Sequence, residues 1–123
     1  YLRAADGIMV DLKTTLDASP DAFQRSIHSF GYATQAALYA QGHEAITGEP
    51  LRDFLFLAVE KARPFAVGLY RLDETALEVG RQHVRRALRT WSECLESVRW
   101  PGYSDRIESI SLPVWAITHE DEA

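Results

Sequence analysis

The sequence predicts an α/β protein with a mixed central β-sheet flanked by helices. Apolar, β-type runs occur at 8–14, 53–60 and 65–72, and two helix-period segments separate the first run from the second. A long amphipathic segment follows the last run. Strands joined by a tight turn run antiparallel, whereas a helical connection lets two strands run parallel. The order of two strands, two helices, two strands and a helix therefore indicates a mixed sheet.

The first two strands, 2–5 and 8–14, are expected to form a β-hairpin around Asp6-Gly7. Asp-Gly between apolar runs is a strong signal for a tight turn. A helix should follow, because Ser19 is a suitable N-cap and Pro20 suits the first helical position. The apolar residues of this helix recur at helical spacing; they are Phe23, Ile27 and Phe30.

A second helix is predicted over about 32–45. Tyr32, Gln35 and Tyr39 should lie along one stripe of this helix. The breaker-rich stretch 47–50 ends it. The runs 53–60 and 65–72, joined by 61–64, are nearly continuous in apolar character. This pattern predicts central strands that are covered on both faces.

A long helix should begin at the cap Asp73 and end near Val98. The tail 104–116 is predicted to be extended, and the acidic end 119–123 to be mobile. Core packing is the favoured interpretation for the three tryptophans, Trp91, Trp100 and Trp115. The expected buried stripe of the long helix comprises Leu77, Val84, Leu88, Trp91 and Leu95.

The composition fits a single modest domain of 123 residues, with one cysteine, Cys94, and no apolar run long enough to cross a membrane. The lone cysteine indicates a reducing, cytoplasmic setting. The net charge of −5 argues mildly against a nucleic-acid partner. Arg81, Arg85 and Arg89 nevertheless share one helix face, which could contact a DNA backbone or could be a solvated face or subunit contact.

The strand 8–14 carries the chemically most informative pattern, Asp11-Leu12-Lys13. Residues two apart on a strand share a face, so the carboxylate and the ammonium should project together. Such a pair is costly to bury unless it is paired or holds a metal. A carboxylate suits Mg²⁺, and a lysine can orient an attacking water. By spacing alone, an ordinary cross-face ion pair is the favoured explanation of Asp11 and Lys13.

Together, the D-x-K-T-T strand at 11–15 and the Y-x-x-Q-x-x-x-Y helix at 32–39 resemble the PD-(D/E)XK nuclease superfamily. Within this superfamily, the sequence more specifically resembles the RecB-like branch and, within that branch, RecE-type nuclease domains. Trp100-Pro101 and the segment 112–116 also carry this narrower similarity. The resemblance covers nearly the whole chain and implies a restriction-endonuclease-like core.

The resemblance implies a Mg²⁺-dependent 5′→3′ exonuclease, with Mn²⁺ as an alternative ion, that acts on double-stranded DNA ends in recombination. It also implies a ring-like homo-oligomer, a single-strand annealing partner, no membrane, and a bacterial or phage origin. In the implied site, Asp11 and the Leu12 carbonyl bind the metal and Lys13 positions the water. Gln35 and Tyr39 line the scissile phosphate. Tyr32 and Thr14 are weaker neighbours of the site, and Tyr32 is assigned to DNA binding.

One departure from the family pattern concerns the metal site. The family carries a further metal-binding Asp on the preceding strand, where this chain has Tyr1, Leu2 and Arg3; Asp6 lies in the turn and is not assigned the role. We therefore expect 1–123 to be the C-terminal part of an N-terminally truncated nuclease domain, inactive by itself. The alternative is a catalytically silent DNA-binding or oligomerisation module of the same fold.

Overall fold

The computed structural model describes residues 2–3 and 6–117, and within them the predicted mixed sheet is confirmed. Its strand order is β1-β2-β3-β4. β1 pairs antiparallel with β2, β2 parallel with β3, and β3 antiparallel with β4. The strands are β1 (Leu2–Arg3), β2 (Ile8–Thr15), β3 (Asp53–Glu60) and β4 (Val67–Arg71).

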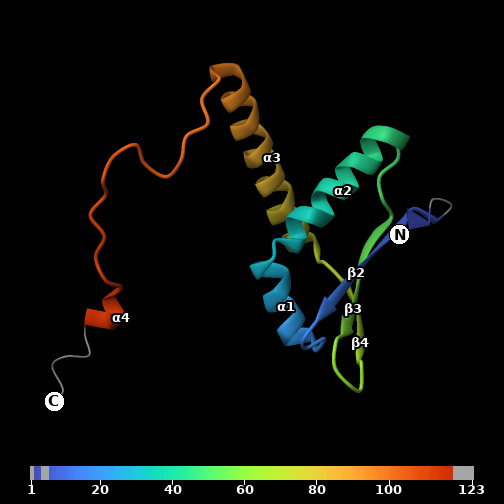
Figure 1. Cartoon of the computed structure of the whole chain (residues 1–123). Helices are drawn as coiled ribbons and strands as arrows, with labels where there is room; N and C mark the ends of the chain where they lie inside the picture. The colour runs from blue at the N-terminus through green and yellow to red at the C-terminus, as the bar shows by residue number, and fades with distance from the viewer. Residues whose placement is uncertain (1, 4–5, 118–123) are drawn as a thin grey trace, which may run out of the picture. The chain divides into compact units, whose positions relative to one another are not determined.

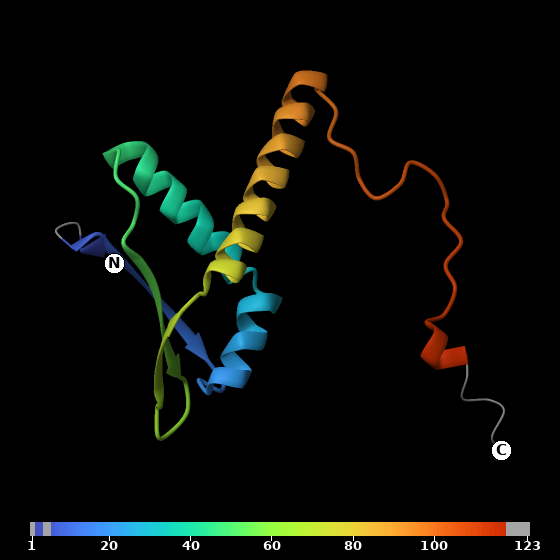
Figure 2. The same cartoon turned by 180° about the vertical axis from the view of Figure 1, so that it is seen from behind.

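The parallel pair β2 and β3 is connected by two helices that lie on one side of the sheet (Figures 1 and 2). The chain forms two compact units, residues 1–91 and 92–123. None of the helices in the described ranges is long and apolar enough to span a membrane. The helices are α1 (Pro20–Ser29), α2 (Tyr32–Thr47), α3 (Glu74–Ser97) and α4 (Val114–Ile117).

The predicted start of α1 is right, but its capping is different. The Ser19 side chain makes no capping hydrogen bond. Instead, the Ser19 backbone N–H donates to Asp17 Oδ1 at 2.8 Å, so Asp17 orders the entry to the helix. α2 runs two residues further than predicted, because Gly48 adopts φ 77° and donates its N–H to the Glu44 carbonyl.

The core lies between the sheet and α1 and α2. Phe54, Phe56 and Ala58 alternate along β3 and are buried on the face toward these helices. Phe56 is fully buried; its ring centroid lies 6.0 Å from that of Phe23 on α1. Ala36 on α2 is also fully buried, so a small side chain lets the helix approach the sheet closely.

The prediction that both strands 53–60 and 65–72 are doubly covered is wrong. β4 is an edge strand and begins at Val67. Val67 and Leu69 are exposed, as is Leu12 on β2, so part of the apolar face directed away from α1 and α2 is open to solvent. The apolar residues of β3 on that face are half-buried. A continuous apolar run shows that both faces are apolar, but it does not supply a second layer to cover them.

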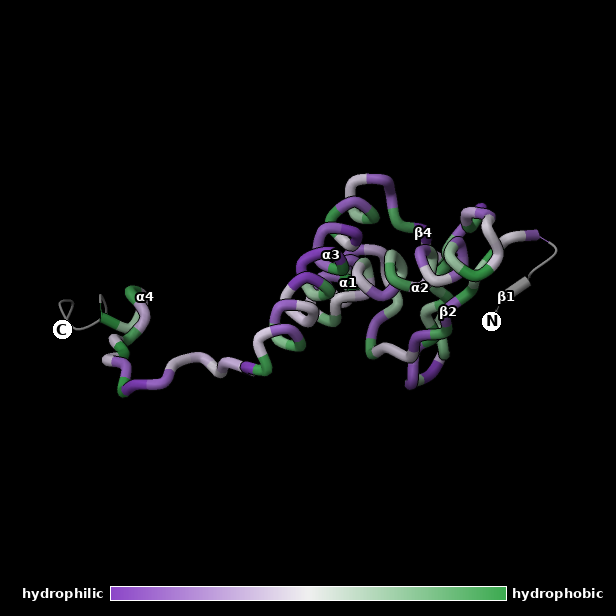
Figure 3. The backbone as a smooth tube through the Cα atoms, turned by 90° about the horizontal axis from the view of Figure 1, so that it is seen from above, coloured by the Kyte–Doolittle hydropathy of each residue, from purple (hydrophilic) through white to green (hydrophobic). Residues whose placement is uncertain are grey.

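The long helix begins as predicted, with Asp73 Oδ1 accepting a hydrogen bond of 2.8 Å from the Ala76 N–H. Hydrophobic and hydrophilic residues alternate along α3 (Figure 3). Val84 is buried, but Leu88, Trp91 and Leu95 are exposed, so the predicted buried stripe is wrong in its second half. A hydrophobic period identifies the apolar face of a helix, not whether another element covers it.

The tail departs from the expectation of an extended segment at its end, where α4 is helical. Trp91, Trp100 and Trp115 are all exposed, so the prediction that they pack in the core is wrong. Phe30, assigned to the apolar stripe of α1, lies beyond the last helical residue and is exposed as well. Cys94 is buried. The acidic end 119–123 lies outside the described residues.

Candidate active site

Strand β2 presents Asp11 and Lys13 on the face that α1 and α2 cover. The strand register sets Asp11 beside Phe56 and Lys13 beside Ala58, and both partners are fully buried. Leu12 points to the opposite face, where it is exposed. The Asp11 and Lys13 side chains are therefore largely withdrawn from solvent, with 21% and 17% of their surface exposed.

The Lys13 ammonium is held by three other side chains. Its Nζ lies 2.7 Å from Asp11 Oδ2 and donates a hydrogen bond of 2.7 Å to Gln35 Oε1 on α2. It also lies 4.3 Å from the centroid of the Tyr32 ring, a distance at which the π-electrons attract a cation. Since β2 and α2 both supply contacts, the ammonium has a fixed position. We call Asp11, Lys13, Gln35 and Tyr32 the Lys13 cluster.

The Asp11 carboxylate has an oxygen suited to a metal ion. Oδ2 is buried and, within the described part of the chain, accepts no well-aligned hydrogen bond; its polar contact there is the ion pair with Lys13. A divalent cation would satisfy such an oxygen, and the adjacent Leu12 carbonyl offers another hard oxygen ligand. In ranges 2–3 and 6–117, no three Asp, Glu, His or Cys side chains form a metal-binding group. The residues present therefore fit one part of a Mg²⁺ site.

Tyr39 follows Gln35 by one helical turn, but within the described residues no hydrogen bond, ion pair or ring contact joins it to the Lys13 cluster. Its ring centroid lies 6.3 Å from that of Phe54, and the residue is 45% exposed. The phenol is thus available to a ligand approaching beside the cluster. Thr14, the weaker neighbour predicted from the motif, is exposed at the end of β2.

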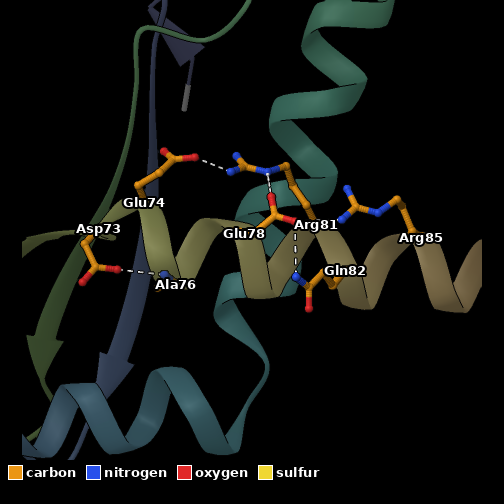
Figure 4. A network of polar contacts seen from close by, with 7 residues as sticks. All are labelled: Asp73, Glu74, Ala76, Glu78, Arg81, Gln82 and Arg85. Atoms are coloured by element: carbon orange, nitrogen blue, oxygen red, sulfur yellow. Dashed lines mark hydrogen bonds and ion pairs between the residues drawn. The ribbon is translucent and has the colours of Figure 1, made fainter.

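Two of the four arginines of α3, Arg81 and Arg85, contact glutamates of the same helix (Figure 4). Arg81 contacts both Glu74 and Glu78, and Arg85 Nη2 donates to Glu78 Oε1 at 2.8 Å. Hydrogen bonds from Arg81 and then Arg85 lower the pKa of Glu78 to about 2. Arg89 makes no ion pair within the described residues. A DNA phosphate would therefore compete with carboxylates for Arg81 and Arg85, but not for Arg89.

Among the cavities formed by the described residues, two lie within the unit that spans residues 1–91. The larger, about 650 Å³, is lined by Arg52, Asp53 and Arg71, and by no member of the Lys13 cluster. The smaller, about 330 Å³, lies at the end of β2 and includes Tyr32 in its lining. Because it adjoins the cluster, the smaller cavity is the more relevant one for chemistry at Lys13.

Phe30 lines this cavity, and the sequence did not identify it as a site residue. Its helical spacing had placed it among the packed apolar residues of the first helix. The residue is 69% exposed and its ring is stacked on Tyr32 at a centroid distance of 5.7 Å. Its position directly before Gly31 was the available signal, since a helical stripe stops where a glycine ends the helix.

Comparison with known proteins identifies the family and the fold. Residues 1–113 match the family described as "PDDEXK-like domain of unknown function (DUF3799)". The chain belongs to this family. The comparison with curated proteins found no match.

The fold is also similar to a crystal structure from Eubacterium rectale, of a protein named "Putative exonuclease". The TM-score is 0.60 at 19% sequence identity, and the similarity covers 93% of this chain. It covers 48% of the other protein, so this chain spans about half the length of that structure. At this identity the comparison establishes the α/β fold alone.

Proposed function

We propose that this chain supplies the catalytic strand of a Mg²⁺-dependent exonuclease that degrades double-stranded DNA from its ends. The observation that carries the proposal is the Lys13 ammonium fixed between Asp11, Gln35 and the Tyr32 ring. Membership of a PDDEXK-like family supports nuclease chemistry. The 5′→3′ polarity, the role in recombination, the ring-like homo-oligomer and the annealing partner rest on the resemblance to RecE-type nuclease domains.

The proposed reaction is hydrolysis of a phosphodiester by a water molecule. Asp11 and the Leu12 carbonyl would hold the Mg²⁺ (or Mn²⁺), which supplies Lewis-acid stabilisation of the phosphate and lowers the pKa of a bound water. Lys13, oriented by Gln35, would hydrogen-bond the attacking water and stabilise the charge that develops on the phosphate oxygens. Tyr39 would contact the scissile phosphate from the exposed side of α2.

Lys13→Ala tests the proposal directly. In the longest natural form of the protein, with Mg²⁺ and linear duplex DNA, we expect nucleotide release to fall by about 10²–10³-fold, because a fixed charge at the reacting group is lost. DNA binding measured in EDTA should be retained. Strands labelled at the 5′ or the 3′ end will report polarity. The matched control is Arg25→Ala, which removes an exposed cation from α1 and should leave the rate unchanged.

Unchanged cleavage in Lys13→Ala would contradict the proposed mechanism. It would favour the alternative of a catalytically silent DNA-binding or oligomerisation module, in which the 2.7 Å contact of Asp11 and Lys13 is a structural ion pair. We expect the 123-residue chain alone to cleave little, because Asp11 provides a single carboxylate toward the metal. Supplying Mn²⁺ in place of Mg²⁺ tests the choice of ion.

A further inference from the structure

The cavity beside Tyr32 has features that the phosphodiester chemistry does not use. It lies where β2 ends against α1, and its lining includes Leu16, Phe30 and Lys61. Leu16 is 85% exposed and Phe30 is 69% exposed, although both are large apolar side chains. When exposed apolar side chains surround one cavity, they indicate a binding surface rather than an unfilled part of the core.

The Phe30 ring is positioned by its neighbours. It stacks on Tyr32 with an interplanar angle of 27°, and Tyr32 in turn contacts Phe23 and Phe56 in the core. The exposed aromatic ring is thus supported on one side by packed rings, while most of its surface is open. A rigid ring with an open face is the arrangement on which nucleobases stack in single-strand-binding proteins.

The cavity is close to the Lys13 ammonium. Phe30 and Tyr32 have ring centroids 5.7 Å apart, and Lys13 Nζ lies 4.3 Å from the Tyr32 centroid, so Phe30 lies within about 10 Å of Nζ. A DNA strand advances about 3.4 Å along the helix axis per nucleotide. A base on Phe30 would therefore belong to a nucleotide within about three steps of a phosphate held at Lys13.

The lining of the cavity supplies one cation that a nucleotide phosphate can approach. Lys61 lies in the lining and makes no ion pair with any residue of the described ranges. Its backbone N–H donates to the Thr15 carbonyl at 3.0 Å, which anchors the residue at the end of β2. The one lining carboxylate among the described residues, Asp17, accepts a hydrogen bond from the Ser19 N–H, and Ser19 accordingly lowers the pKa of Asp17.

We propose that this cavity binds a single-stranded DNA nucleotide next to the scissile phosphate, with its base stacked on Phe30 and a phosphate near Lys61. The proposal rests on the proposed nuclease function and specifies how that site takes its substrate: the end of the duplex must separate for a base to reach the ring. Stacking uses the π-face that every base has, so the cavity selects for an unpaired base without selecting a sequence.

The test is binding of a single-stranded oligodeoxynucleotide in EDTA, where no cleavage can occur. One strand has all its bases, and a second of equal length and charge is abasic. Phe30→Ala should weaken binding of the first strand about tenfold and leave the abasic strand unaffected, because stacking is lost while phosphate contacts remain. Phe30→Trp should retain binding. Lys61→Ala should lower the slope of log K against log salt by about 0.7.

Tyr103→Ala is the matched control, because it removes a fully exposed aromatic ring elsewhere in the chain. The proposal is overturned if Phe30→Ala binds the base-containing strand as tightly as the unaltered protein does. It is also overturned if Tyr103→Ala weakens binding equally, or if the unaltered protein binds no single strand. Phe30-dependent binding without Mg²⁺-dependent cleavage would reject the nuclease function alone; cleavage without Phe30 dependence would reject this inference alone.

Discussion

Gly80 shows how strongly a single residue can control the packing of this protein. A Cβ at this position would lie 2.2 Å from the Ala33 carbonyl oxygen and 3.1 Å from the Ala37 Cβ. Real side chains do not approach a backbone atom that closely, so α2 and α3 can touch here because residue 80 has no side chain. Lys13 is similarly dependent on its surroundings: an ordinary lysine becomes a candidate catalytic group through its three partners.

Gly80→Ala should therefore lower the free energy of unfolding by about 1–3 kcal/mol, because the helices must move apart to admit a methyl group. The control is Gly42→Ala, at a helical position with nothing within 4 Å of the added Cβ. That change should raise the free energy of unfolding by about 0.5–1 kcal/mol through helix propensity. Chemical denaturation of both variants measures the difference. Equal effects at the two sites would mean that α2 and α3 are not in close contact.

At the scale of secondary-structure elements, α3 carries its own electrostatic network. Glu78 accepts hydrogen bonds from Arg81 and Arg85, which lie one and two helical turns further along α3. It also accepts a hydrogen bond from Gln82. Hydrogen bonds and charge from these donors stabilise the ionised carboxylate. The same network raises the pKa of Arg81, chiefly through Glu78 and then Glu74. The first turns of α3 are therefore sensitive to protonation of Glu78.

The pKa of Glu78 falls from 4.5 to about 2 in the folded protein, so its stabilising contribution is complete above about pH 4.5. It is lost progressively as the pH falls from about 4.5 through 2. We expect the stability difference between the unaltered protein and Glu78→Gln to shrink over that range, as followed by far-UV circular dichroism during unfolding. Glu93→Gln, at a carboxylate without an ion pair in the described ranges, is the control. Parallel pH profiles for all three proteins would contradict this account of Glu78.

At the scale of the whole molecule, one face of the sheet carries both the core and the candidate site. Phe56 is fully buried among Phe23, Phe54 and Tyr32, and the Lys13 cluster is built over the same face. Tyr32 belongs to both, since it packs on Phe56 and contacts Lys13 Nζ. The aromatic core thereby supports the ring beneath the ammonium, which ties stability to the geometry of the site.

Phe56→Ala should cost roughly 3–5 kcal/mol of unfolding free energy, because it leaves a cavity where a fully buried ring packs. Phe30→Ala, at an exposed ring, should change stability by no more than about 0.5 kcal/mol. Thermal or denaturant unfolding of the two variants checks the contrast. A large loss of stability in Phe30→Ala would mean that this ring serves the core and is not free to receive a ligand.

The sequence alone determined the element order, the mixed sheet and the shared face of Asp11 and Lys13, because strand and helix periodicities and turn residues are local properties. It also placed Gln35 on the helix that faces this strand. It did not reveal that Val67, Leu69 and the tryptophans are exposed, since periodicity marks an apolar face but not what covers it. Only the tertiary structure decided that Tyr32 lies beneath the ammonium, that Tyr39 stands apart, and that Phe30 opens onto a cavity. Those relations join residues of separate elements, and their distances are set by how the helices pack on the sheet.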